Sequence, residues 1–344
     1  MESNRKMKKE KFIYINYLKL IGLFLIILAH VCKNSYILQL RNFDVPLMVI
    51  ISGFLAYGSY NRSIEKDKSL LKYYWKRISR LLIPTWIFLT IYFLLIKIAF
   101  INKEYPYDFN KILRSFLLID GIGYVWVIRV YLMCSFITPL IFYLNDKIKS
   151  NKIKFLILVA IYVLYELFVY FEINELNFIF NYIIAYIIPY GCIYILGMIS
   201  KNTSPKTDGK ISSIFIILFM ISFIIINFKN GLFQSTQTMK YPPTMYYISY
   251  ALFVSFLLLC IAKSVKLKDF KIIDFCSKSS LWIYLWHIMF LSITSAFIGD
   301  LHWIIKYILV LIGSIVVTYI QNEIIDIIEE KTKINKNILK VFRG

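Results

Sequence analysis

The chain has 344 residues, of which 59% are hydrophobic and 17% are charged, and its net charge is +20. Soluble domains carry about 25% charged residues, so this composition, with a mean hydropathy of +0.65, excludes a soluble globular protein. A net charge of this size also suits nucleic-acid-binding proteins, but the positions of the basic residues favour a membrane protein.

Apolar stretches recur along the whole chain at about 20 residues each, the length with which an α-helix crosses roughly 30 Å of hydrocarbon. The sequence therefore predicts an all-α polytopic membrane protein, a bundle of about ten transmembrane helices. We expect a single membrane domain over residues 1–344 with no attached soluble domain, and an uncleaved first span after the basic N-terminus. The predicted spans are 12–32, 43–60, 79–100, 124–144, 153–171, 178–199, 211–228, 243–263, 279–298 and 303–328.

The predicted spans divide the basic residues unevenly between the two sides of the membrane. If the N-terminus is on the cytoplasmic side, the cytoplasmic segments hold 29 of the 40 Lys and Arg residues and the loops on the other side hold seven. The other four lie within spans or at their edges. Inside loops are enriched in Lys and Arg in membrane proteins, so the sequence predicts that both termini are cytoplasmic. Topology and attraction to anionic lipids then account for the positive charge. Membrane lipids are expected partners, and nucleic acid is not.

The first span, which includes "LKLIGLFLIILAH" at residues 18–30, carries two side chains unsuited to lipid, Lys19 and His30. At about 100° and 1.5 Å per residue, the two project from one helix face, roughly 16 Å apart along the axis. Ionisable residues inside a span line a protein interior or a water-filled cavity and are functional by default. The alternative for each residue is an interfacial position, with the lysine reaching the headgroups. The shared face favours the functional interpretation.

The rest of the chain has no familiar catalytic signature. The five cysteines are scattered, without a C-x-x-C pair or a Cys/His cluster, so neither a disulfide framework nor a metal site is indicated. A Gly-rich phosphate loop and a Ser nucleophile elbow are also missing from the sequence. The chemistry would therefore depend on polar side chains inside the bundle.

Lys19 and His30 form a Lys-x10-His motif that resembles the first-span motif of the acyltransferase-3 family, integral-membrane enzymes that O-acetylate surface polysaccharides. Asn16 stands where the family often has Asp. The stretch "VPLMVIISGFL" at residues 45–55 resembles the second-span signature of the family, which is built around Ser-Gly-Phe and here contains Ser52.

Three later stretches extend this resemblance in the same order along the chain. "YYWKRISRLLIP" at residues 73–84 resembles the basic start of the third span, and "GYVWVI" at 123–128 retains one Trp of a Leu-Trp-Phe-Leu motif. "SLWIYLWHIMF" at residues 280–290 resembles a late Tyr-Leu-x-His motif. The matches cover most of the chain, and ten spans suit the family.

The resemblance implies an acyl donor, usually acetyl-CoA, from the cytoplasm and a hydroxyl acceptor outside or in the membrane, with no permanently bound cofactor. Arg77 and Arg80 are three residues apart and share a helix face, and guanidinium groups bind phosphates in a bidentate manner. Together with Lys19 they are the expected CoA-binding residues. His30, grouped with Lys19 as catalytic, would act as a general base or would carry the acyl group transiently.

Six more residues are candidates for lining this site. Ser52 and Trp126 are candidate oxyanion donors, although Ser52 equally suits a helix contact and Trp126 an interfacial anchor. A carboxylate can orient a catalytic imidazole, which makes Asp44 a candidate partner of His30. The full set of possible lining residues is Ser52, Trp126, His287, Asp44, Glu166 and Arg129.

The leading hypothesis is an acetyl-CoA-dependent O-acetyltransferase in a bacterial cytoplasmic membrane, acting on a surface polysaccharide such as a capsule or on its lipid-linked precursor. One alternative is a transporter of small solutes or glycans, which often shows symmetry between its halves. The Lys-x10-His motif has no counterpart in the second half of the sequence, which favours the enzyme. A catalytically inactive membrane module is the third hypothesis.

Overall fold

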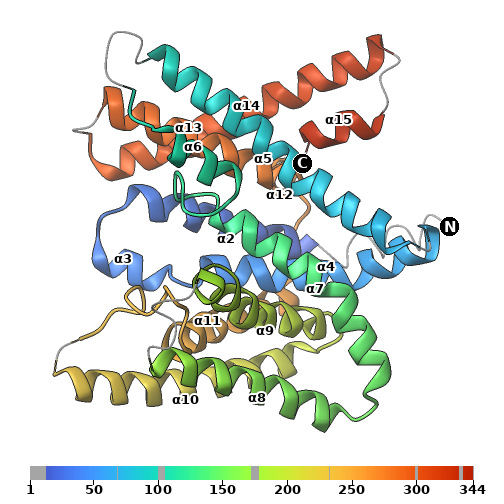
Figure 1. Ribbon diagram of the computed structural model, residues 1–344, viewed down its shortest axis with the longest axis vertical. Helices are drawn as coiled ribbons and strands as arrows, with labels where there is room; N and C mark the ends of the chain where they lie inside the picture. The colour runs from blue at the N-terminus through green and yellow to red at the C-terminus, as the bar shows by residue number, and fades with distance from the viewer. Residues whose placement is uncertain are drawn as a thin grey trace. The chain divides into compact units, whose positions relative to one another are not determined.

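The computed structural model describes residues 13–67, 69–99, 105–171, 178–231, 233–298, 301–332 and 336–343. It is 83% helical, and the described ranges contain no strand. Figure 1 shows the helices, which are α2 (Ile13–Val31), α3 (Ser35–Leu40), α4 (Asp44–Asp67), α5 (Leu70–Ala99), α6 (Phe109–Phe116), α7 (Trp126–Lys147), α8 (Asn151–Tyr170), η1 (Phe180–Ile184), α9 (Ala185–Ser200), α10 (Pro205–Asn230), α11 (Met245–Ser264), α12 (Lys271–Lys278), α13 (Ser280–Phe297), α14 (Trp303–Lys331) and α15 (Lys336–Arg343).

Ten helical segments of the described residues are long and apolar enough to cross a membrane, which confirms the predicted all-α membrane fold and its spans in order. Several helices extend beyond the predicted ends: α5 begins at Leu70 rather than about 79, and α4 continues to Asp67 rather than about 60. A 30-residue helix is about 45 Å long, well beyond the hydrocarbon thickness. Hydropathy locates the apolar layer, whereas the helices continue past it. The side on which the termini lie stays a prediction.

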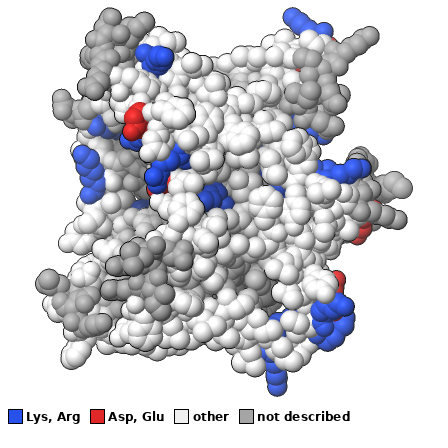
Figure 2. All heavy atoms as spheres, in the orientation of Figure 1, with Lys and Arg blue, Asp and Glu red and all other residues white. Residues whose placement is uncertain are grey.

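Three of the spanning helices expose most of their surface. Only 6% of the spanning residues of α10 and 11% of those of α8 are buried inside the protein, and 17% of those of α14. Large apolar side chains cover their outer faces, as expected for helices whose solvent is lipid. On the face drawn in Figure 2, side chains other than Lys, Arg, Asp and Glu predominate, and Lys and Arg gather in a few places.

The chain divides into two compact units, each made of segments that are far apart in sequence. Unit 1 comprises Met1–Gly22, Asn34–Leu70 and Met133–Lys268, and unit 2 comprises Leu23–Lys33, Leu71–Leu132 and Asp269–Gly344. Helices α2 and α7 contribute to both units. The single domain expected over residues 1–344 stays a prediction.

In unit 1, α4 and α9 cross at two glycines that face the backbone of the opposite helix. A Cβ atom on Gly53 of α4 would lie 2.0 Å from the carbonyl oxygen of Tyr194. A Cβ atom on Gly197 of α9 would lie 2.1 Å from the carbonyl oxygen of Ile50. Small residues allow such close backbone approach between membrane helices. Gly53 belongs to the Ser-Gly-Phe signature, so this signature has a packing role.

We predict that Gly53→Val strongly destabilises unit 1, because its side chain would meet backbone atoms that cannot move without separating α4 and α9. Overpacking of this kind costs about 1–3 kcal/mol or more, which for a chain of 344 residues corresponds to a fall in Tm of roughly 1–4 °C or more. Thermal unfolding of the purified protein in detergent measures the effect. Gly209→Ala is the matched control, since a Cβ atom there would meet only the Cys260 sulfur at 3.5 Å. Equal Tm values for the two variants would contradict the prediction.

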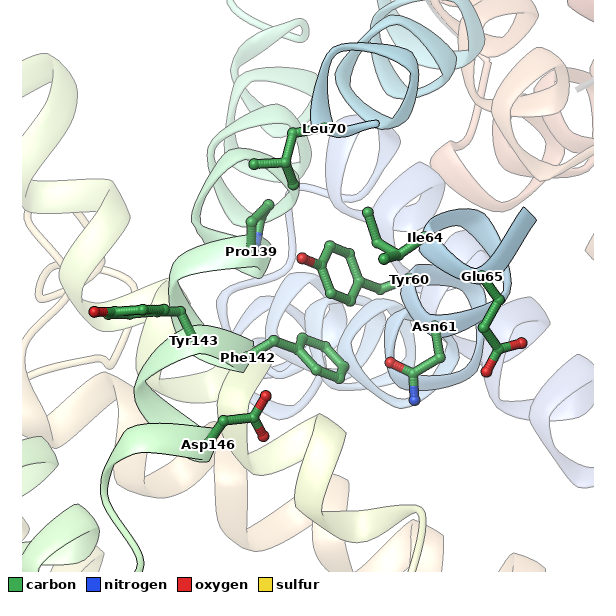
Figure 3. A pocket seen from close by; sticks show the side chains of 9 residues that line it. All are labelled: Tyr60, Asn61, Ile64, Glu65, Leu70, Pro139, Phe142, Tyr143 and Asp146. Atoms are coloured by element: carbon green, nitrogen blue, oxygen red, sulfur yellow. The ribbon is translucent and has the colours of Figure 1, made fainter. Parts of the chain in front are cut away.

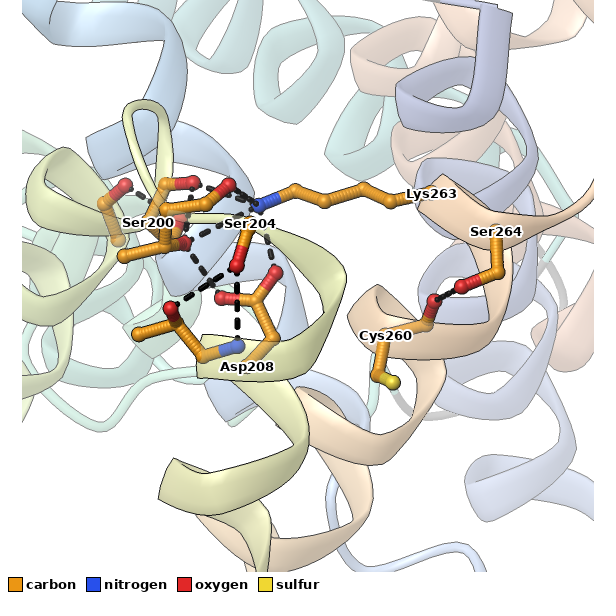
Figure 4. Close-up of polar contacts among 9 residues, drawn as sticks. Ser200, Ser204, Asp208, Cys260, Lys263 and Ser264 are labelled. Atoms are coloured by element: carbon orange, nitrogen blue, oxygen red, sulfur yellow. Dashed lines mark hydrogen bonds and ion pairs between the residues drawn. The ribbon is translucent and has the colours of Figure 1, made fainter.

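A buried ion pair holds α9, α10 and α11 together at one end of unit 1 (Figure 4). Lys263 Nζ lies 2.6 Å from Asp208 Oδ2, and both side chains are buried. The ammonium group also donates to the carbonyl oxygens of Ser200 at 2.7 Å and Thr203 at 3.2 Å, where α9 ends. Asp208 lies in the first turn of α10, after the N-cap residue Ser204, and the helix dipole favours a negative charge there. Three helix ends are therefore fixed by one lysine.

In unit 2, α13 packs along α14, and side-chain hydrogen bonds connect both helices to α15. The Trp286 indole N–H donates to Gln321 Oε1 at 2.7 Å, and the amide of Gln321 donates to the Phe342 carbonyl oxygen at 2.5 Å. Both side chains are half-buried, and each of these polar groups has a partner. The hydrogen bonds fix the position of Trp286, which precedes His287 on α13.

Helices α5 and α13 run in the same direction within unit 2. The rings of Phe88 and Trp286 have centroids 5.8 Å apart, and the Tyr92 hydroxyl lies 2.9 Å from that of Ser292. The residue numbers increase on both helices from the first contact to the second, so the helices are parallel. Phe88 therefore lies at about the level of His287 along the axis.

Candidate active site

Two of the predicted site residues, His30 and His287, meet inside unit 2. Their imidazole rings are stacked, with centroids 5.4 Å apart and an interplanar angle of 23°. The ring of Tyr124 stands edge-on to His30, with centroids 4.7 Å apart and an interplanar angle of 90°. Tyr124 is also 6.2 Å from His287. The last residues of α2, the middle of α13 and the segment before α7 thus form one cluster, which we call the histidine cluster (His30, His287 and Tyr124).

His287 is fully buried, and its ring is held by its own helix. Nδ1 is hydrogen-bonded to the carbonyl oxygen of Tyr284, one turn earlier on α13. A carbonyl oxygen only accepts, so Nδ1 carries a proton. Nε2 is buried and has no hydrogen-bond partner among the described residues. Buried polar atoms nearly always have a partner, so this nitrogen calls for an explanation, and a role in the site is one.

His30 is the accessible member of the cluster, since its side chain is exposed near the C-terminal end of α2. Lys19 lies on the same helix, so the face that the sequence predicts belongs to one continuous helix, Ile13–Val31. A substrate can therefore reach the His30 ring. The His287 ring beneath it is buried and is held in place by its hydrogen bond to Tyr284. The arrangement suits proton transfer at His30.

Tyr124 is a site residue that the sequence analysis missed. Its carbonyl oxygen accepts a hydrogen bond from the Tyr284 hydroxyl at 2.5 Å, and this bond ties the segment before α7 to α13. Its own hydroxyl has no hydrogen-bond partner in the described ranges, and its side chain is half-buried. Burial, with a further contribution from Tyr92, raises the pKa of Tyr124 above its ordinary value, so the phenol stays protonated.

The predicted phosphate-binding residues lie on α5, well away from the level of the histidines. Arg80 and Arg77 precede Phe88 by about 12 and 17 Å along the helix axis. Arg80 is exposed, and the Arg77 guanidinium lies 5.2 Å from the centroid of the Tyr73 ring. Arg77 is half-buried, and two guanidinium groups on one helix face can bind phosphate groups bidentately.

Trp126 and Arg129 lie in the first turn of α7, shortly after Tyr124. Trp126 is half-buried and Arg129 is buried, with 8% of its surface exposed. Both lie in unit 2, which contains the histidine cluster. Their predicted roles stay predictions.

The remaining predicted residues, Lys19, Ser52, Asp44 and Glu166, belong to unit 1. Lys19 and Ser52 are half-buried on α2 and α4. The Glu166 carboxylate on α8 accepts a hydrogen bond from the Tyr162 hydroxyl, one turn earlier, at 2.8 Å. A tyrosine partner of this kind satisfies a polar group within its own helix, and the role of Glu166 in the site stays a prediction.

Asp44 is bound by two basic residues of unit 1. Arg41 Nη1 lies 2.5 Å from Asp44 Oδ2, and Lys240 Nζ lies 3.9 Å from Asp44 Oδ1, with all three side chains buried. Arg41 also donates to Gln237 Oε1 at 3.3 Å. The cluster fixes the segment before α11 to the start of α4. The sequence analysis counted Arg41 and Lys240 only as outside-loop charges, and its suggestion that Asp44 orients His30 stays a prediction.

The charge on Lys240 makes stability depend on pH. Burial outweighs the attraction of Asp44 and lowers the pKa of Lys240 from 10.5 to about 8. Between these values the unfolded chain binds a proton that the folded chain does not, so stability rises with pH across this window, by roughly 3 kcal/mol. We expect the Tm of the wild type to rise with pH relative to that of Lys240→Met, in which Asp44 keeps Arg41. Parallel Tm profiles from pH 8 to 10.5 would contradict this expectation.

Unit 1 also contains an open hollow of about 440 Å³ between the ends of α4 and α7 (Figure 3). Its wall combines aromatic side chains with two carboxylates and lacks histidine. None of the residues predicted for the site lies in it. The lining residues are Tyr60, Asn61, Ile64, Glu65, Leu70, Pro139, Phe142, Tyr143 and Asp146.

Ten apolar helical segments and a cluster of polar side chains within them define a multi-pass helical membrane protein. The family model of the acyltransferase-3 family, described as an acyltransferase domain, matches residues 12–321. The chain therefore belongs to the acyltransferase-3 family and is a membrane acyltransferase. The matched range includes every residue predicted for the site. Neither the curated proteins nor the solved structures contain a match to the chain.

Proposed function

We propose that the protein transfers an acetyl group from cytoplasmic acetyl-CoA to a hydroxyl group of a cell-surface polysaccharide or of its lipid-linked precursor, in a bacterial cytoplasmic membrane. The observation that carries the proposal is the stacked pair of His30 and His287, which combines an exposed imidazole with a buried one. Acyl transfer to a hydroxyl requires a base for the hydroxyl proton, and histidine is the residue that most often supplies it.

The acyl donor binds at the arginine end of unit 2 in this proposal. Arg77 and Arg80 bind the phosphates of CoA, with Lys19 adding a positive charge on the same predicted side of the membrane. The flexible pantetheine arm then extends along α5, over the separation between Arg80 and the level of the histidines. This places the thioester at His30 while the nucleotide stays at the cytoplasmic surface.

The transfer itself is a displacement at the thioester carbonyl. His30 takes the proton of the acceptor hydroxyl as its oxygen bonds to the carbonyl carbon, and the C–S bond then breaks. The protonated imidazole returns the proton to the departing CoA sulfur, so the products are the acetyl ester and free CoA. A second route, in which His30 first accepts the acetyl group itself, uses the same contacts. We favour the first route because it needs no covalent intermediate.

We predict that Arg77→Ala and Arg80→Ala raise KM for acetyl-CoA and change kcat little, because the arginines bind phosphates that take no part in the reaction. Hydrogen bonds to charged groups contribute about 1.5–3 kcal/mol, so each change should raise KM roughly 10- to 150-fold. Initial rates over a range of acetyl-CoA concentrations measure both constants. Lys152→Ala, which removes an exposed positive charge on α8, is the control. A fall in kcat with unchanged KM would place the arginines in the chemical step instead.

The proposed function is tested with acetyl-CoA labelled in its acetyl group, added to membranes that contain the protein and surface glycan of the native host. We expect label to enter the glycan with the wild type and not with His30→Ala. Label that enters no glycan, together with uptake of a solute that depends on the protein, would favour the transporter.

A further inference from the structure

Unit 2 carries a group of tyrosines next to the histidine cluster. Tyr92 belongs to α5, and Tyr105 and Tyr107 lie in the segment before α6, which the sequence predicts outside the membrane. The Tyr92 and Tyr107 hydroxyls are 2.7 Å apart, and the Tyr92 hydroxyl is 2.9 Å from that of Ser292 on α13. Tyr105 donates to the Phe93 carbonyl oxygen at 3.3 Å. These phenols lie on the side of Phe88 opposite Arg77 and Arg80.

The hydroxyls of this group are linked in a chain. The Tyr92 hydroxyl is hydrogen-bonded to those of Ser292 and Tyr107, and Ser292 also lies 3.2 Å from the Ile288 carbonyl oxygen. Either hydroxyl of the Tyr92–Tyr107 pair can be the donor, and in both cases the Tyr107 oxygen keeps a lone pair. A hydroxyl has one proton and two lone pairs, so the Tyr107 oxygen still accepts hydrogen bonds from other molecules. Its side chain is half-buried and therefore reachable.

Tyr124 adds a group of the opposite kind. Its hydroxyl has no partner among the described residues and can both donate and accept. Its ring is edge-on to His30, at 4.7 Å between centroids, and lies 6.2 Å from His287 on α13. The other tyrosines reach the same helix through the hydrogen bond between Tyr92 and Ser292. Tyr124 thus contacts the histidine cluster directly, and Tyr107 is joined through Tyr92 and Ser292 to α13, five residues after His287.

We propose that the hydroxyls of Tyr124 and Tyr107 form the binding site of the acceptor, and that they select a polyhydroxylated ring such as a sugar. One acceptor hydroxyl donates to Tyr107 and another accepts from Tyr124, while a third lies at His30. This inference rests on the proposed function, because it assigns the acceptor side of the same site. A wall of phenols suits a sugar, since each phenol pairs an apolar ring with a polar tip. A site built to hydrogen-bond hydroxyls also rejects molecules that lack them.

The test measures equilibrium binding by calorimetry, with oligosaccharide fragments of the host's surface glycan and the full-length protein in detergent. We expect Tyr107→Phe and Tyr124→Phe each to raise the Kd about 3- to 12-fold, the value of one hydrogen bond. Tyr105→Phe is the matched control from the same segment, because the Tyr105 hydroxyl already donates its proton to the Phe93 carbonyl oxygen and has no role in the proposed site. Its Kd should equal that of the wild type.

The outcomes separate this inference from the proposed function. Wild-type protein that binds no fragment, or tyrosine variants that bind like the wild type, would overturn the inference even if acetyl transfer occurs. Fragment binding that depends on both tyrosines would support it even if no acetyl group is transferred, in which case the proposed function fails. In an active protein, we further expect both variants to raise KM for the fragments and to leave KM for acetyl-CoA unchanged.

Discussion

Replacing His30 by alanine is expected to lower the rate of acetyl transfer by about 10²- to 10⁴-fold, the contribution of a positioned general base. The imidazole is the accessible member of the histidine cluster, and neither His287 nor Tyr124 can take its place, because His287 is buried and Tyr124 stays protonated. Binding of acetyl-CoA should be retained, since the arginines on α5 are unchanged. The loss should therefore appear in kcat.

His302→Ala is the matched control for this result. His302 is exposed at the start of α14, where its side chain accepts a hydrogen bond from the Ile304 N–H. Both variants should elute as folded protein in size-exclusion chromatography, and only His30→Ala should lose activity. Equal rates for His30→Ala and the wild type would remove His30 from the reaction.

Lys263→Met is expected to destabilise the folded protein by about 3–5 kcal/mol, because it leaves the Asp208 carboxylate buried without its cation. The lysine also donates to two carbonyl oxygens at the end of α9, which lose this donor. The thermal unfolding temperature in detergent, compared with that of the wild type, measures the change. We expect the lowest Tm among the variants of unit 1.

The double variant Lys263→Met/Asp208→Leu shows whether Lys263→Met destabilises the protein through the unpaired buried charge of Asp208 or through lost packing. Removing both charges with side chains of similar volume is often neutral in stability, so the double variant should recover most of the loss. A Tm equal to or below that of Lys263→Met would show that the charge on Asp208 is not the cause. A double-mutant cycle with Asp208→Leu then gives the coupling energy of the pair.

The membrane fold could be predicted from the sequence because each span is a predominantly apolar stretch of about 20 residues. The ends of α4 and α5 could not, since a helix continues into water without any change in its hydrogen bonding. The sequence allowed two roles for the Ser-Gly-Phe stretch, an oxyanion donor at Ser52 or a contact between helices. The helix contact at Gly53 became visible only from the position of Tyr194 on α9.

Only part of the candidate site could be predicted from the sequence. His30 and His287 stand out because ionisable residues are rare inside spans, but their contact joins helices far apart in sequence and has no local signal. Tyr124 is one of 27 tyrosines, so its residue type carries no information. Its one local signal is its place two residues before Trp126, in a stretch already recognised. Likewise, nothing near Lys240 in the sequence points to Asp44.

The central claim is that His30 and His287 act as one unit in acetyl transfer. It is tested most directly by acetyl-CoA consumption in the presence of surface glycan, with His30→Ala, His287→Ala and the double variant in liposomes. Residues that act together give strongly non-additive losses, so we predict that the double variant is no slower than the slower single variant. Losses that multiply in the double variant, or a His30→Ala protein that keeps the wild-type rate, would contradict the claim.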